Sequence, residues 1–161
     1  MTISVPASSS GASVAHAAAT QHEFRGNCHC GAIDVRLAFT RSAAETQTRA
    51  CQCGFCTRQG ALTISDPAGR ASIEIHAGHF STYKFATQSA ASLICGTCGV
   101  YAGAILQDGD RIWSIANVRG LAIPGFKDRA GVPMQYEHET IEERINRRKL
   151  RWTPTAIRFR V

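Results

Sequence analysis

Seven cysteines, all of them in short groups, constrain this 161-residue chain more than any other feature. The groups are Cys28-x-Cys30, Cys51-x-Cys53-x-x-Cys56 and Cys95-x-x-Cys98. An odd number of thiols cannot pair completely as disulfides, and cysteines that only fill a core have no reason to cluster. In a reducing compartment, clustered cysteines more often bind metal. We therefore expect the fold to be built around metal sites.

Two of the cysteine groups have the form of metal knuckles. Gly31 follows Cys30 and Gly99 follows Cys98, and glycine permits the tight turn in which backbone N–H groups donate to a metal-bound sulfur. Together these groups supply the four ligands of a tetrahedral structural zinc site, namely Cys28, Cys30, Cys95 and Cys98. Because the two pairs are far apart in the sequence, one metal ion would join two distant segments of the fold.

The remaining group, Cys51, Cys53 and Cys56, supplies three thiolates and has no obvious fourth ligand. Structural zinc sites are closed, whereas a catalytic zinc keeps three protein ligands and one position for water or substrate. The triplet fits the catalytic pattern, so we expect two zinc ions per chain. Two alternatives stay open: a redox pair of Cys53 and Cys56, or a closed site completed by a histidine. The candidate histidines are His29, His76 and His79.

Alternation of apolar and polar residues predicts a mainly β domain of antiparallel strands. The predicted strands are residues 32–39, 60–64, 71–77, 79–86, 100–106 and 111–118. Only residues 138–150 predict a helix, with Ile141 and Ile145 on its apolar face. Because its start is rich in Ala, Ser and Thr, we expect the chain to divide into a disordered tail, residues 1–22, and one zinc-binding domain, residues 23–161.

The net charge of +6 is concentrated in the C-terminal segment, where residues 141–161 carry seven Lys and Arg against two Glu. We interpret this basic segment as a solvated helix face and tail. Nucleic acid is not an expected partner, because no aromatic residues are interleaved with the basic ones. The sequence has no apolar run of membrane-spanning length, and its first 24 residues lack the Lys and Arg of a secretory signal or transit peptide. We therefore expect a cytoplasmic protein with no membrane partner.

Three stretches in this order, "GNCHCGAI", "CQCGFCTRQGAL" and "SLICGTCGVYAG", resemble the cysteine motifs of the glutathione-dependent formaldehyde-activating enzymes, whose domain is shared with centromere protein V. The resemblance covers about Phe24 to Trp152 and includes "IANVRGL" and "EERINRRKLRWTP". It implies a β-tent of antiparallel sheets with one C-terminal helix. It also implies structural zinc on the four knuckle cysteines and catalytic zinc on the triplet. The sequence departs from the family in "ATQSAASLIC", where many members carry a basic residue and a His-aromatic pair.

The resemblance implies a carbon–sulfur lyase that adds glutathione to formaldehyde, giving S-hydroxymethylglutathione, and reverses the addition. Cys51, Cys53 and Cys56 are then the catalytic residues, and a small thiol and a small aldehyde are the partners. Arg49, Arg58 and Arg119 are candidate cations for an anionic thiol, but the sequence assigns no substrate-binding residue. The competing hypothesis is a non-catalytic zinc protein whose basic C-terminal segment mediates binding.

Overall fold

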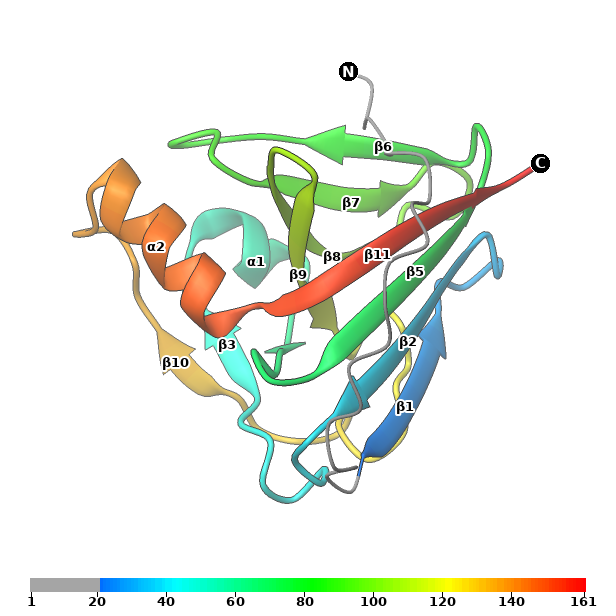
Figure 1. Cartoon of the computed structure of the whole chain (residues 1–161), viewed down its shortest axis with the longest axis horizontal. Coiled ribbons are helices and arrows are strands. Elements are labelled where there is room, and N and C mark those ends of the chain that lie inside the picture. Colours follow the sequence, from blue (N-terminus) through cyan, green and yellow to red (C-terminus); the bar gives the residue numbers. More distant parts are fainter. Residues whose placement is uncertain (1–20) are drawn as a thin grey trace.

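The structure is a computed structural model that describes residues 21–161, and these form eleven strands and two helices (Figure 1). In chain order they are β1 (His22–Asn27), β2 (Ile33–Phe39), β3 (Arg49–Cys51), α1 (Gly54–Arg58), β4 (Thr63–Ile64), β5 (Arg70–His76), β6 (Phe80–Tyr83), β7 (Ala91–Cys95), β8 (Tyr101–Asp108), β9 (Arg111–Asn117), β10 (Val132–Met134), α2 (Ile141–Arg151) and β11 (Thr153–Arg160). In this part of the chain neither helix has the length and apolar character that crossing a membrane requires.

The prediction of a mainly β domain with a C-terminal helix is confirmed. In β2, the alternate residues from Ile33 to Phe39 are buried, while Arg36 between them is exposed. The predicted helix is α2, and α1 is an additional single turn that the sequence pattern did not indicate. The predicted disordered tail, residues 1–22, lies outside the described residues except for its last two positions, and β1 begins at His22.

The strands form one sheet that folds into two sides, in agreement with the β-tent (Figure 1). One side is β1-β2-β5-β11, and the other continues from β9 through β4, β3 and β10, with β8, β7 and β6 added at β9. β11 joins the two sides because its first residues pair with β9 and the rest pair with β5. Most neighbours are antiparallel as predicted, but β5–β11 and β3–β10 are parallel.

The main core lies between the two sides of the sheet. Ile33 and Ile73 from one side and Leu93 and Ile105 from the other belong to the same buried cluster. A smaller cluster of Leu106, Trp113 and Trp152, with Ile145 packed against it, holds α2 against β8 and β9. Figure 1 shows α2 close to α1, β3 and β10 at one end of the molecule, where the candidate site lies.

Candidate functional site

The turns that follow β1 and β7 bring the four knuckle cysteines together. All four sulfur atoms lie within 4.8 Å of one another. The sulfur of Cys30 is 3.7 Å from that of Cys28 and 3.5 Å from that of Cys95. Tetrahedral zinc with bonds of about 2.3 Å separates its sulfur ligands by about 3.8 Å. The spacing of this cluster therefore fits a four-cysteine zinc site that would join the β1–β2 turn to the β7–β8 turn.

Backbone N–H groups already favour negative charge on part of this cluster. The N–H of Ile33 donates to the sulfur of Cys28 at 3.2 Å, although burial still raises the pKa of Cys28 to about 12. At Cys98 burial also acts to raise the pKa, but the N–H groups of Val100 and Cys30 outweigh it and lower the pKa to about 6. These contacts are the knuckle hydrogen bonds that stabilise a metal-bound thiolate.

The triplet is formed by the end of β3 and the start of α1. Cys51 is the last residue of β3, Cys53 is the N-cap of α1, and Cys56 lies within that helix. The N–H of Cys56 donates to the sulfur of Cys53 at 3.4 Å, and the three sulfur atoms lie within 4.8 Å of one another. Among residues 21–161 no histidine, aspartate or glutamate joins this group. The three sulfur atoms fit a metal ion that keeps one position open.

Hydrogen bonding within the triplet makes one of its sulfur atoms acidic. The thiol of Cys56 hydrogen-bonds to Cys51 and lowers the pKa of Cys51 to about 6. The same hydrogen bond, followed by burial, raises the pKa of Cys56 far above its ordinary value. A thiolate is therefore present at neutral pH, as a cation-binding group requires.

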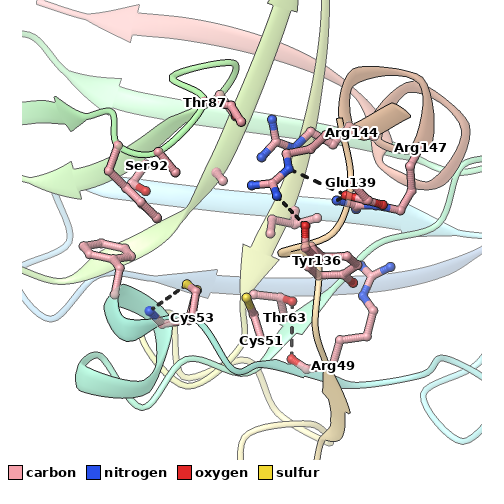
Figure 2. Close-up of a pocket in the computed structure, with 18 of the residues that line it drawn as sticks. Arg49, Cys51, Cys53, Thr63, Thr87, Ser92, Tyr136, Glu139, Arg144 and Arg147 are labelled. Atoms are coloured by element: carbon pink, nitrogen blue, oxygen red, sulfur yellow. Dashed lines mark hydrogen bonds and ion pairs between the residues drawn. The ribbon is translucent and has the colours of Figure 1, made fainter. Parts of the chain in front are cut away.

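The triplet opens into a cavity of about 590 Å³ (Figure 2), a volume typical of small-molecule sites. One wall of the cavity is aromatic: the ring centre of Phe55 lies 5.2 Å from that of Phe85 and 5.0 Å from that of Tyr101. Burial, and then the negative charge of the cysteines, raises the pKa of Tyr101, so its hydroxyl keeps its proton. That hydroxyl is hydrogen-bonded to Ser92, which belongs to the stretch that departs from the family.

The opposite wall of the cavity is basic. Figure 2 shows Arg144 and Arg147 across the cavity from the sulfur atoms of Cys51 and Cys53. Arg148 also lines this wall, and the positions 144, 147 and 148 share one face of a helix. The basic wall as we define it consists of Arg49, Arg144, Arg147 and Arg148.

One carboxylate, Glu139, neutralises part of the basic wall. Arg147 donates to both oxygens of Glu139 at 2.5 and 2.9 Å, and the Nε of Arg144 lies 3.6 Å from one of them. The hydrogen bonds from Arg147 hold the pKa of Glu139 below its ordinary value. The guanidinium of Arg147 also lies 3.8 Å from the ring centre of Tyr136, so this pair is fixed in position.

Of the three arginines named from the sequence as candidate cations for an anionic thiol, one lines the cavity. Arg49 lines the cavity. Arg58 instead donates to the backbone oxygen of Gly54 at 2.7 Å, and Arg119 donates to that of Gly60 at 3.3 Å; neither lines the cavity. Three of the four arginines of α2, Arg144, Arg147 and Arg148, were assigned to a solvated helix face, but they line the cavity. Their spacing in the sequence, at positions 144, 147 and 148, indicates that they lie on one face of the helix.

A sequence model of the glutathione-dependent formaldehyde-activating enzyme family matches residues 23–118, which include all seven cysteines. The chain belongs to this family. A crystal structure of a Rhodobacter sphaeroides protein is similar to this member, with 29% sequence identity and a TM-score of 0.50. That similarity covers 70% of this chain and 99% of the other. The family match ends at Val118, so α2 and the loop before it lie outside the matched residues.

Proposed function

We propose that this family member is a zinc-dependent carbon–sulfur lyase that forms and cleaves the adduct of a small thiol and a small aldehyde. Glutathione and formaldehyde are the first substrates to test, because the family is described by them. The observation that carries the proposal is the triplet: three sulfur atoms converge, and their open side faces a cavity large enough for a small molecule. The four knuckle cysteines would hold a second, structural zinc ion.

The reaction needs no oxidant or reductant. The thiol sulfur forms a bond to the carbonyl carbon, the π electrons of the C=O bond move to oxygen, and the proton lost by the thiol is placed on that oxygen. Zinc held by three thiolates would supply a fourth ligand position that lowers the pKa of a thiol placed there. Cys51, Cys53 and Cys56 fix that position at the cavity wall, while Phe55 and Tyr101 cover it with apolar surface.

A zinc count tests the two-site arrangement. We expect about two zinc ions per chain in the purified protein and about one in Cys53→Ser, with the circular dichroism spectrum unchanged. The matched control is Cys98→Ser, which removes a knuckle ligand and should impair folding. A wild-type count of one would remove the second site, and unfolding of Cys53→Ser would make the triplet structural.

Activity needs a separate measurement. NMR exchange spectroscopy of formaldehyde with its glutathione adduct should show faster exchange with the wild-type protein than with Cys53→Ser or with no protein. Equal exchange rates in all three samples would exclude this activity.

The distribution of basic side chains supports a small-molecule role for the C-terminal segment over contact with nucleic acid. Arg144, Arg147 and Arg148 line the cavity. Outside it, Lys149 is paired with Asp108, and Arg160 is paired with Glu74. A non-catalytic zinc protein would have a triplet closed to added thiols. In the cobalt-substituted protein, glutathione should therefore change the absorption spectrum only if the lyase proposal is correct.

A further inference from the structure

The basic wall carries more positive charge than the carboxylates beside it can balance. Four arginines and two glutamates line the cavity. Glu139 is shared by Arg144 and Arg147. The other carboxylate, Glu137, is on an exposed residue and forms no ion pair with these arginines within the described residues. The remaining positive charge lies on the wall that faces the triplet.

Arg148 is the one arginine of α2 in the basic wall that forms no ion pair with Glu139. Its Nη1 donates to the hydroxyl of Ser89 at 2.6 Å, and its guanidinium lies 5.2 Å from the ring centre of Trp152. Its Nε is buried and has no hydrogen-bond partner among residues 21–161. Burial, then the charges of Arg147 and Arg144, lowers its pKa to about 10, so it remains charged at neutral pH. A charge in this setting is stabilised by an anion.

Arg49 is a second arginine of this wall without a carboxylate. It comes from β3, two residues before Cys51, and its Nη2 donates to the hydroxyl of Ser65 at 2.5 Å. No aspartate or glutamate in the part of the chain that the structure describes forms an ion pair with it. Two separate elements, β3 and α2, therefore direct unpaired guanidinium groups at the same cavity.

We propose that Arg148 binds a carboxylate of the thiol substrate, while Arg49 adds positive charge to the same cavity, so that the site selects acidic thiols over neutral ones. This inference rests on the proposed function for the identity of the ligand. A guanidinium is planar and matches a carboxylate with two parallel hydrogen bonds. The substrate would then span the cavity, with its sulfur at the triplet and its carboxylate at α2.

Arg148, the main residue of this anion site, lies outside the family match, which ends before α2, whereas Arg49 lies within it. The cysteines would provide the reaction common to the family, while α2 would select the acidic thiol as substrate. A neutral thiol would form no ion pair with Arg148, so the buried charge of its guanidinium would stay without an anion. The difference between acidic and neutral thiols should therefore appear in binding.

The test uses a tripeptide that cannot react. γ-Glutamyl-alanyl-glycine has the two carboxylates of glutathione but no sulfur atom, so its binding does not depend on catalysis. We expect calorimetry on the zinc-loaded protein to show binding that weakens about tenfold or more when both carboxylates are esterified. Arg148→Met should weaken binding of the acid by a similar factor and leave binding of the diester nearly unchanged. Arg148→Lys should lie between the two.

Arg151→Met is the matched control, because it removes the same charge from the same helix at an exposed position that does not line the cavity. It should bind the acid as the wild type does. The proposal is overturned if Arg148→Met keeps the wild-type preference for acid over diester, if the wild type does not bind the acid, or if inorganic phosphate binds more tightly than the acid. Failure of the lyase activity would not change any of these binding measurements.

Discussion

At the scale of single residues, Asn117 shows how one buried side chain positions a wall of the cavity. Its Oδ1 accepts a hydrogen bond from the N–H of Leu62 at 3.1 Å, and its Nδ2 donates to the backbone oxygen of Tyr101 at 2.8 Å. The side chain is 2% exposed. It therefore ties the segment after α1 to the strand that carries Tyr101.

Replacing Asn117 by leucine keeps the side-chain size but leaves two buried backbone groups unpaired. Each such group costs about 1–3 kcal/mol, so we expect Asn117→Leu to lower the free energy of unfolding by about 3 kcal/mol. Urea denaturation measures this change. Asn146→Leu, at an exposed position of α2, should stay within about 0.5 kcal/mol of wild type. A loss below about 1 kcal/mol in Asn117→Leu would contradict the assignment.

Asp66 is a buried carboxylate whose hydrogen bonds make stability depend on pH. The N–H and hydroxyl of Thr40 both donate to its Oδ2 at 2.7 Å, and the N–H of Ala68 donates to its Oδ1 at 3.0 Å. Burial acts to raise the pKa of Asp66, but these hydrogen bonds outweigh it and lower the pKa below the ordinary value. The folded state thus favours the charged form.

Because the pKa of Asp66 is lower in the folded state, its contribution to stability is present above the ordinary Asp pKa of about 3.9 and is lost as the pH falls through the folded value. We expect urea midpoints of the wild type to exceed those of Asp66→Asn at pH 6, with the gap closing toward pH 3. Any loss of metal in acid would affect both proteins equally, so the difference between their urea midpoints reports the contribution of Asp66 alone. A gap that stays constant over this range would refute the linkage.

At the residue scale, the two cysteine groupings could be predicted from spacing, because ligand types are few and knuckle turns are local in sequence. The place of Arg148 in the cavity wall could not, because it depends on where α2 packs. No pattern in the sequence indicated that Ser92 and Tyr101 would line the cavity. Their meeting at the cavity depends on the register of β7 against β8, in which Ser92 pairs with Ala104 and Ile94 with Tyr101.

At the scale of elements, α2 is the part of the fold on which the basic wall depends. A capping box begins the helix: the hydroxyl of Thr140 accepts from the N–H of Glu143 at 3.2 Å, and the carboxylate of Glu143 accepts from the N–H of Thr140 at 2.8 Å. Arg144 follows directly. The cap therefore fixes the first turn that presents an arginine to the cavity.

Removal of the cap should weaken the helix without touching the cavity. We expect Thr140→Ala to lower the free energy of unfolding by about 1 kcal/mol, measured by urea denaturation. Glu142→Gln changes a residue in the same turn that makes neither capping bond and should lower stability by less than about 0.5 kcal/mol. Equal effects of the two variants would show that the capping box contributes nothing.

Among the elements, β11 is a strand that its basic residues made difficult to predict from the sequence. Its residues alternate, with Thr153 and Ile157 buried and Arg158 exposed. This is the period of a strand, but the run of basic residues led to an interpretation as a solvated tail. The pairing of β11 with β5 and β9 is long-range, so no local pattern predicts which strands it joins. The five-residue α1 is also too short to be predicted from the spacing of its apolar residues.

At the scale of the whole molecule, the four-cysteine cluster joins the two sides of the tent. Cys28 and Cys30 lie between β1 and β2 on one side, whereas on the other side Cys95 ends β7 and Cys98 lies between β7 and β8. Binding a metal there would close a loop of more than half of the matched family region. The energy of such a site contributes directly to the free energy of folding.

We therefore expect a strong chelator to lower the melting temperature sharply once the knuckle cluster loses its metal. Structural zinc contributes on the order of 10 kcal/mol in small peptides, so even a fraction of this should move the melting temperature by tens of degrees. Calorimetry with parallel metal analysis measures both quantities, and adding back zinc is the control. An unchanged melting temperature in metal-free protein would contradict a structural role.

β11 also sets an order of events during synthesis on the ribosome. The strand lies between β5 and β9 in the sheet, yet the ribosome makes it after both, and after every cysteine. Until it emerges, β5 and β9 lack the strand that lies between them in the described sheet. The nascent chain would thus display reactive thiols and two open sheet edges at the same time. Early capture of metal by the knuckles would shield the growing polypeptide from aggregation and oxidation.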